Sequence, residues 1–360
     1  MWRKILQIVG VVVAMALIVA YICYASYLAQ EQRSKQRVDK LVITMEDANS
    51  ERRLSSPDVI YDQLQNDGVK IEAELMDSVD VARIVKVVSA NSYVENVDFY
   101  ITYSGVAHLD VAQHAPILRM LNSGFNSYIT ADGTIFRAPE GAACHVSVVT
   151  GNFKPLFPSS YEGNVADYYA SLEAKEDEKL VELKQEFAEL DSQRSDVISR
   201  KSNLKGELRR KIFESKESHE QRRVGVKSAL AKCDDELLAL KKAEAKLCKR
   251  EETIEKRKKK LQKSYDDFMN LINFVSRVRN DRFWGAEVVQ FVASTTHEGE
   301  ISLRLIPRSG DFVIEFGVLA DSEAKLAKLE QFYDKGLSRM GWGLYKTIDV
   351  RYDKQIICKK

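Results

Sequence analysis

The amino-acid sequence predicts an α+β protein with a single transmembrane helix, a small β-α-α-β-β module, and a mixed or antiparallel β domain interrupted by a long antiparallel coiled-coil hairpin. Three observations predict this fold class: an uncharged apolar segment near the N-terminus, strands of alternating polarity on both sides of a central block, and heptad spacing within that block. The predicted boundaries are a cytoplasmic tail at 1–4, a transmembrane helix at 5–29, the small module at 37–113, the β domain at 114–164 and 266–360, and the coiled-coil hairpin, inserted at 165–265.

The composition and motifs argue against several classes of function. The chain has 54 basic and 53 acidic side chains and a formal net charge of +1, so there is no electrostatic case for binding nucleic acid. The five cysteines are widely separated and the five histidines are scattered, which does not fit a zinc site. No nucleophile elbow, P-loop, GxGxxG or HExxH motif occurs. The sequence therefore predicts a protein that is not an enzyme and has no catalytic residues, no metal site and no cofactor.

The N-terminal apolar segment predicts an uncleaved membrane anchor. No charged residue occurs in the 26 residues between Lys4 and Glu31, which is long enough for a helix to cross a hydrocarbon core. A cleaved signal peptide is the alternative, but its apolar region would be roughly 7–15 residues long. Basic residues precede and follow the segment, so their count does not decide its orientation. The short preceding tail favours a body outside the cytoplasm.

The small module is predicted from the order of its elements. A strand at 40–46 is followed by a helix that begins at Ser56-Pro57, where Ser56 can cap the helix and Pro57 suits its first position. A second helix begins near Asp77, and two strands of alternating polarity follow it. The order β-α-α-β-β directly after an anchor resembles a POTRA domain, a module with which envelope proteins bind partners.

The β domain is predicted on both sides of the central block. Asp132-Gly133 is a strong hairpin signal between two short strands. The predicted strands lie at 117–121, 128–130, 134–136 and 146–149 before the block, and at 288–293, 301–305 and 312–316 after it. An amphipathic helix at 324–340 then precedes the last stretch.

The central block predicts a coiled coil because its apolar residues recur at alternating steps of three and four. The first run contains Leu180, Leu183, Phe187, Leu190, Val197 and Leu204, with Arg194 and Lys201 at its only polar seam positions. The second contains Val226, Leu230, Cys233, Leu237, Leu240 and Leu247. The phase breaks in the polar stretch 214–225, and two runs of similar length favour an antiparallel hairpin. Parallel pairing of two chains through this block is the alternative.

The last stretch, 341–360, predicts a pair of strands. Its alternating residues are Ile348, Val350 and Tyr352 on one side and Thr347, Asp349 and Arg351 on the other. The pattern is interrupted at 353–354 and resumes at 355–358. A strand at a sheet edge has backbone N–H and C=O groups that can pair with another chain. The alternative is a strand that only completes its own sheet.

Several motifs outside the central block resemble the FtsQ/DivIB family of bacterial cell-division proteins, in its Bacteroides-type form. They are PILR at 116–119, YI at 128–129, DG at 132–133 and GNF at 151–153, then RFWGAE at 282–287, GEI at 299–301, LIPR at 305–308 and YKTIDVRY at 345–352. Thr130 stands where the family commonly has aspartate. The coiled-coil block is not a usual part of the family, so the resemblance assigns it no role.

The resemblance implies a division scaffold that spans the inner membrane once, with its N-terminus cytoplasmic, its body periplasmic and its location the division septum. It implies recruitment of FtsB and FtsL, which connect to septal peptidoglycan synthesis. It also implies that other division proteins could bind the POTRA-like module. FtsB adds a strand along the last strands of the β domain. The corresponding partner-binding residues here are Asp349, Val350, Arg351, Tyr352, Lys354, Gln355, Ile356 and Ile357. Arg351 offers charge-assisted hydrogen bonds, and Tyr352 offers an amphipathic anchor.

A periplasmic adaptor of a transport or secretion complex is the alternative function. Such proteins also combine an anchor, a coiled-coil hairpin and β domains. They have similar half-motifs on the two sides of the hairpin, and this sequence shows none.

Overall fold

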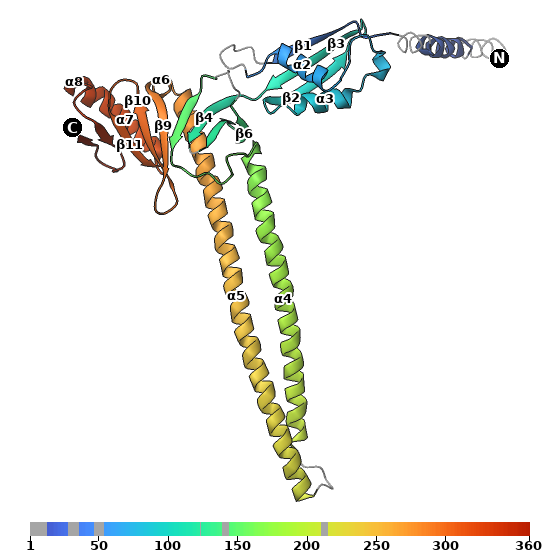
Figure 1. Cartoon of the computed structure of the whole chain (residues 1–360), viewed down its shortest axis with the longest axis vertical. Helices are drawn as coiled ribbons and strands as arrows, with labels where there is room; N and C mark the ends of the chain where they lie inside the picture. Colours follow the sequence, from blue (N-terminus) through green and yellow to red (C-terminus); the bar gives the residue numbers. More distant parts are fainter. Residues whose placement is uncertain (1–12, 28–35, 47–53, 123, 139–143, 210–214) are drawn as a thin grey trace, which may run out of the picture. The chain divides into compact units, whose positions relative to one another are not determined.

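The structure, a computed structural model, describes residues 13–27, 36–46, 54–122, 124–138, 144–209 and 215–360. These residues form two units. The first contains Met1–Thr150 and Arg279–Phe291, and the second contains Gly151–Val278 and Val292–Lys360. The helices and strands are labelled in Figure 1.

The N-terminal helix requires a correction to the predicted fold class. Residues 13–27 are helical, whereas 5–12 and 28–29 of the predicted span, and the predicted tail at 1–4, lie outside the described residues. Crossing a hydrocarbon core takes about 20 apolar helical residues. Within the described part of the chain, no helix is long and apolar enough to cross a membrane. The predicted single transmembrane helix is therefore wrong, and so is the inner-membrane localisation that depended on it.

The first unit contains a three-stranded sheet with helices packed against it. Its elements are β1 (Lys40–Glu46), α2 (Pro57–Asn66), the short 3-10 helix η2 (Met76–Ser78), α3 (Val81–Ser89), β2 (Val94–Ile101) and β3 (Val106–Gln113). The strand order is β1-β3-β2, with β1 parallel and β2 antiparallel to β3. The helices α2 and α3 run beside this sheet in Figure 1. The order of the elements is β-α-α-β-β, while the POTRA-like assignment and the domain boundaries stay predictions.

Local sequence explains where these two helices begin. The Ser56 hydroxyl accepts a hydrogen bond from the Val59 N–H at 3.4 Å, with proline in the first turn. The Asp80 carboxylate caps α3 by accepting from the Arg83 N–H at 3.0 Å, so α3 begins later than the predicted start near Asp77. The core of this sheet is apolar and contains Ile60, Leu64, Ile84, Val88, Leu109 and Val111. Burying each such side chain stabilises the fold by about 1.5–3 kcal/mol.

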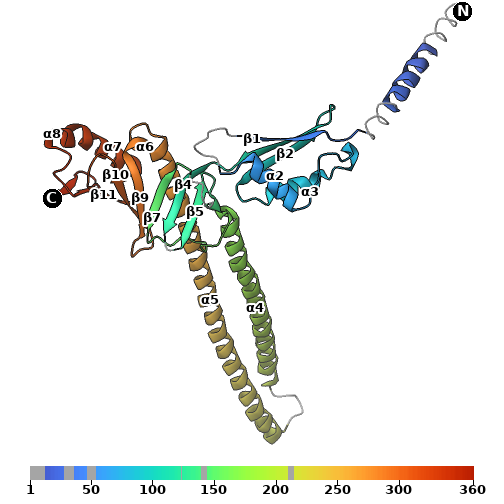
Figure 2. The ribbon, with the colours of Figure 1, turned by 45° about the horizontal axis from the view of Figure 1, so that its top comes forward.

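The first unit also contains β4 (Pro116–Asn122), β5 (Phe125–Thr130), β6 (Thr134–Arg137) and most of β7 (Ser147–Gly151). β4 and β6 each pair antiparallel with β5, and β7 pairs parallel with β4 (Figure 2). The Thr130 hydroxyl contacts the Asp132 carboxylate and accepts from the Thr134 N–H at 2.9 Å, so this threonine closes the β5–β6 turn. The Arg279 guanidinium donates to the carbonyls of Pro116 and Ile117, at 3.2 and 3.1 Å.

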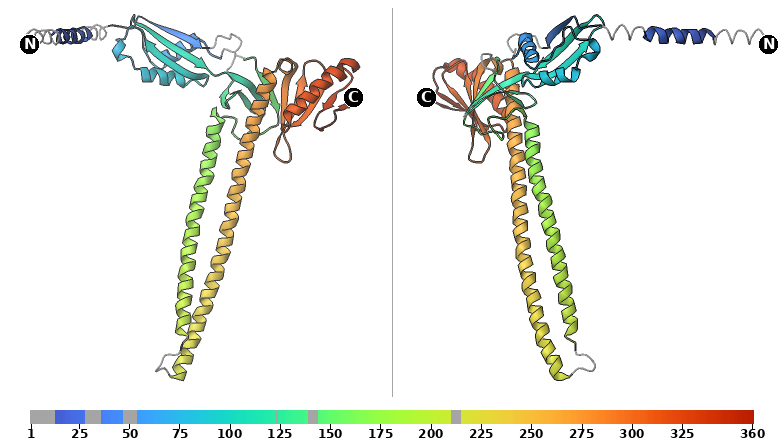
Figure 3. Two further views of the ribbon diagram at one scale, coloured as in Figure 1. Left: turned by 180° about the vertical axis from the view of Figure 1, so that it is seen from behind. Right: turned by 45° about the vertical axis from the view of Figure 1, so that its right-hand side comes forward.

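The second unit contains two long helices, α4 (Val165–Glu207) and α5 (Lys216–Asn280, of which residues up to Val278 belong to this unit). They run side by side in both views of Figure 3. Ion pairs between described residues of the two helices include Glu186–Arg250, Arg194–Glu244, Arg200–Glu236 and Lys201–Asp234. The residue number in α5 falls as that in α4 rises, so the helices are antiparallel. The coiled coil predicted for this block stays a prediction.

The rest of the second unit is a sheet covered by helices. Its strands include β10 (Ile301–Pro307), β11 (Val313–Val318), β12 (Thr347–Asp349) and β13 (Ile357–Lys359), with β10–β11 antiparallel, β11–β12 parallel and β12–β13 antiparallel. α7 (Ser322–Phe332), the π-helical turn η3 (Tyr333–Leu337) and the short α8 (Ser338–Met340) connect β11 to β12. The remaining elements of the chain are β8 (Gly163–Asn164), α6 (Trp284–Glu287) and β9 (Val288–Thr295), which contributes residues to both units. The final part of α5 packs here, with the Phe274 and Phe316 rings 4.8 Å apart.

Candidate functional site

The candidate site is the end of the sheet formed by β12 and β13. Ile348 is paired with Cys358, and Asp349 with Ile357. The strand order places β13 at the end of the sheet, where β12 is its only neighbour among the described strands. An edge strand directs backbone N–H and C=O groups outward, so another extended chain can pair with it.

The structure places the predicted site residues in two different environments. Asp349 and Val350 are buried, with 4% and 0% of their surfaces exposed, whereas Tyr352 is 46% exposed. Arg351, Lys354 and Gln355 are exposed, and Ile356 and Ile357 are half-buried. The predicted alternation put Tyr352 on the same side of a strand as Val350, and Asp349 on the other side. In the structure β12 ends at Asp349, so the period of two does not extend to Tyr352.

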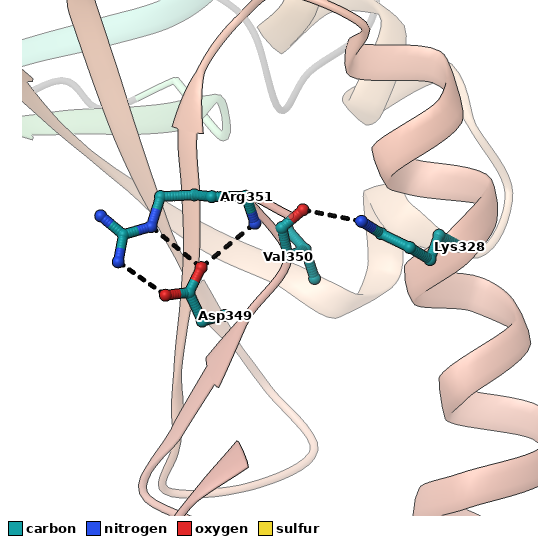
Figure 4. Close-up of polar contacts among 4 residues, drawn as sticks. All are labelled: Lys328, Asp349, Val350 and Arg351. Atoms are coloured by element: carbon teal, nitrogen blue, oxygen red, sulfur yellow. Dashed lines mark hydrogen bonds and ion pairs between the residues drawn. The ribbon is translucent and has the colours of Figure 1, made fainter. Parts of the chain in front are cut away.

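Asp349 is buried beneath a bidentate ion pair with Arg351 (Figure 4). The guanidinium Nε donates to Oδ1 of Asp349 at 2.9 Å and Nη2 donates to Oδ2 at 2.6 Å, while the Arg351 backbone N–H donates to Oδ1 at 3.1 Å. The side-chain hydrogen bonds from Arg351 lower the pKa of Asp349 against the opposing effect of burial. The same hydrogen bonds raise the pKa of Arg351. The carboxylate therefore holds the arginine in one orientation.

The aliphatic part of Arg351 lies on a glycine of β11. Gly317 has a φ of +77°, and a Cβ added there would lie 2.7 Å from Cγ of Arg351 and 2.9 Å from its Cδ. These separations are too short for carbon atoms in contact. Position 317 therefore requires glycine for two reasons: its backbone is left-handed, and a Cβ would overlap the side chain of Arg351.

A lysine on α7 holds the backbone of the same segment. The Lys328 ammonium donates to the carbonyl of Val350 at 2.9 Å (Figure 4) and also to the carbonyl of Tyr352. The Val350 N–H donates to the Glu315 carbonyl at 3.1 Å. Residues 350–352 are thus fixed from both sides, by α7 and by β11.

The structure brings Asp349, Arg351 and the backbone of Tyr352 together and shows two supporting residues that sequence reasoning missed, Lys328 and Gly317. Lys328 is one of several lysines on an amphipathic helix, and nothing local distinguishes it. Gly317 lies in the middle of a strand pattern, where an isolated glycine often marks a close approach. The glycine within the strand pattern could have indicated a close approach at position 317, but it does not identify Arg351 as the residue that approaches.

Among the described residues, no group of three or more histidine, cysteine, aspartate or glutamate side chains could hold a metal ion. Cys358 in β13 is half-buried, and burial raises the pKa of its thiol. What the site offers is an arrangement of strand edge and side chains suited to contact with a protein.

Comparison with known families gives one match. Residues 250–359 match the family model described as FtsQ/DivIB, C-terminal related. The matched segment includes the end of α5 and the strands from β9 to β13, and so it contains the whole candidate site. No curated protein matches the chain.

Proposed function

We propose that this chain, whose residues 250–359 match the FtsQ/DivIB C-terminal related family model, is a non-enzymatic cell-division scaffold that recruits FtsB and FtsL through β13 and the adjoining residues 349–356. The recruited proteins connect it to septal peptidoglycan synthesis. Other division proteins bind the module formed by β1 to β3. The observation that carries the proposal is the position of β13 at the edge of its sheet, directly after a segment with exposed side chains.

Backbone pairing supplies the first part of this recognition. A strand of FtsB adds to the outer side of β13, where its main-chain groups replace water as hydrogen-bond partners. Because β13 is only three residues long, backbone pairing alone gives little selectivity. Side chains next to the strand must therefore select the partner.

Exposed side chains supply the second part. Tyr352 offers a large amphipathic surface at low entropic cost, and Arg351 offers donors whose direction Asp349 has already set. The exposed Lys354 and Lys359 add positive charge to the same edge. We therefore expect acidic side chains beside the added strand of the partner.

Asp349 and Val350 take a supporting part. Their side chains are buried, so they act through the position of Arg351 and through the packing of β12. A substitution at either residue changes recruitment indirectly, by moving the exposed groups.

The test is capture of FtsB–FtsL by the purified full chain. Tyr352→Ala is expected to weaken capture about tenfold or more, as loss of a central aromatic contact does. The control is Tyr103→Ala, which removes a tyrosine that is 73% exposed in the first unit. Equal capture by wild type and Tyr352→Ala would refute the side-chain part of the proposal.

Proline substitutions test the backbone part. Successive backbone N–H groups of a strand point to opposite sides, so Ile357→Pro and Cys358→Pro remove N–H groups on opposite sides of β13. One variant is expected to lose a bond to β12 and melt at a lower temperature. The other is expected to keep the wild-type melting temperature and lose capture. If both variants capture FtsB–FtsL like wild type, β13 is not the recruiting edge.

A further inference from the structure

The hairpin formed by α4 and α5 exposes large apolar side chains that its own packing does not cover. They are Val181 and Ile198 on α4 and Val224 and Leu238 on α5, and their exposed fractions lie between 50% and 62%. Seam residues such as Leu183, Val197 and Cys233 are buried between the helices. The exposed apolar residues are therefore additional to the contact between α4 and α5.

Three of these residues, Val181, Ile198 and Leu238, lie on one face of the hairpin. Arg200 and Glu236 each come one position before a seam residue, and they form an ion pair at 2.7 Å, so such positions share a face. One step along a helix turns by about 100°, which moves the positions after seam residues to the opposite face. Ile198, Leu238 and Val181 occupy such positions, because they follow Val197, Leu237 and Leu180. We call this the apolar face.

The ion pairs also show which residues of α4 and α5 are at the same height. Because Arg200 meets Glu236, Ile198 lies at the height of Leu238, two residues from each partner. Because Glu186 meets Arg250 at 2.6 Å, Lys184 lies at the height of Glu252 by the same step. The apolar face thus carries an apolar pair at one height and an oppositely charged pair at another.

A groove opens on this face between the two pairs. Its volume is about 330 Å³, and its lining combines the charged Asp191, Arg194 and Glu244 with the apolar Phe187, Ala188, Leu190 and Leu240. These side chains leave apolar surface in contact with water on a helix pair that is otherwise highly charged. A covering surface would gain from burying it.

We propose that the apolar face is the contact between two copies of this chain, packed hairpin against hairpin with a two-fold axis along the hairpin. That axis places α4 of one copy against α5 of the other at the same height. Ile198 then packs against Leu238 of the second copy, and Lys184 pairs with Glu252 of the second copy. Each contact occurs twice, as a two-fold interface requires.

Charge complementarity favours a second copy over another occupant. Charged residues of both signs are interspersed on the apolar face: Asp177, Lys184, Asp191 and Lys205 on α4 and Glu220, Lys227, Asp234, Lys241, Glu252 and Glu255 on α5. A partner helix of one sign would meet repulsion from part of these charges, whereas a second hairpin in the stated orientation brings opposite signs together at 184 and 252. Glu252 also contacts Lys256 at 2.6 Å, and its second oxygen remains available for an additional donor. This proposal does not depend on the recruitment of FtsB and FtsL.

The first test measures the mass of the purified full chain in solution by sedimentation at increasing concentration. Wild type is expected to form dimers. The variant Ile198→Lys/Leu238→Lys is expected to dissociate at least about tenfold more readily, since each lysine would be buried in an apolar layer. The control Gln193→Lys/Ala239→Lys adds two lysines at exposed positions of the opposite face and is expected to dimerise like wild type. Melting temperatures show that both variants are folded.

The second test exchanges charges and distinguishes this orientation from any other. Lys184→Glu and Glu252→Lys, taken singly, are each expected to weaken dimerisation several-fold. The double variant Lys184→Glu/Glu252→Lys restores opposite signs across the interface and is expected to recover it. A wild-type chain that sediments as a single copy at every concentration overturns the proposal. Loss of FtsB–FtsL capture by the lysine variant does not change that conclusion, because the proposal concerns only the contact between two copies. A double variant weaker than both single variants overturns the stated orientation.

Discussion

The guanidinium of Arg351 forms two hydrogen bonds with the carboxylate of Asp349, at 2.9 and 2.6 Å, and this pair joins a buried residue to the surface. The side chain of Asp349 is 5% exposed and that of Arg351 is 51% exposed. The buried carboxylate of Asp349 needs the opposite charge of Arg351, and the two hydrogen bonds hold the Arg351 guanidinium in one orientation. Substitution of the buried Asp349, which a binding partner would not contact, is therefore expected to change the orientation of the exposed Arg351.

Stability is expected to depend on pH through Asp349. Its pKa is lowered in the folded protein from an ordinary value of 3.8, so its carboxylate stabilises the fold fully above that value and the contribution is lost as pH falls through the folded value. Asp349→Asn is expected to reduce the free energy of unfolding at pH 7 by about 1–2 kcal/mol, a range that allows for solvent around Arg351. Denaturant unfolding between pH 3 and 7 measures both effects. Asp353→Asn, at an exposed aspartate, is the control.

Gly317→Ala is expected to destabilise the second unit by about 2 kcal/mol or more, because a positive φ and a collision with Arg351 act together. Gly299→Ala is the matched control. Gly299 also has a positive φ, +83°, but an added Cβ would meet nothing within 4 Å. The difference between the two melting temperatures measures the collision alone. Equal losses would show that Arg351 does not lie on Gly317 in solution.

Lys328→Ala is expected to weaken capture of FtsB–FtsL without removing any group that touches the partner. The ammonium of Lys328 holds the carbonyls of Val350 and Tyr352, and their release lets the segment move. Faster amide hydrogen exchange at 350–355 is expected to accompany the lower affinity. Lys335→Ala, at an exposed lysine after α7, should leave both measurements unchanged. Normal exchange with reduced capture would instead assign Lys328 a direct contact.

Removing most of the hairpin is expected to leave the sheet of the second unit folded. The rings of Tyr169 and Tyr265 stack at 5.0 Å between centroids, so a short glycine-serine linker can replace residues 171–264. The shortened protein is expected to capture FtsB–FtsL like the full chain and to lose the dimerisation described above. Capture and sedimentation of the shortened protein test both points. Loss of capture by a folded shortened protein would show that the hairpin takes part in recruitment.

Local sequence predicted those features that depend on a few neighbouring residues. Ser56 and Pro57 were expected to begin a helix, and Ser56 caps α2. Cys233 was expected in a helix seam and is 4% exposed. The prediction of a membrane-spanning helix was wrong, because no helix within the described residues is long and apolar enough to cross a membrane. The alternating strand was predicted to extend to Tyr352, whereas β12 ends at Asp349.

The sequence by itself determined the cap of α2 at Ser56, the turn at Asp132-Gly133 and the segment in which the candidate site lies, because these follow from residue conformation and from hydrophobic spacing within a few residues. Tertiary structure decided which side chains of that segment are exposed. Asp349 is buried because Arg351 supplies its counter-charge and Gly317 makes room for Arg351. Lys328, on a separate helix, holds the backbone that follows. Such contacts join residues distant in sequence, so no local pattern encodes them.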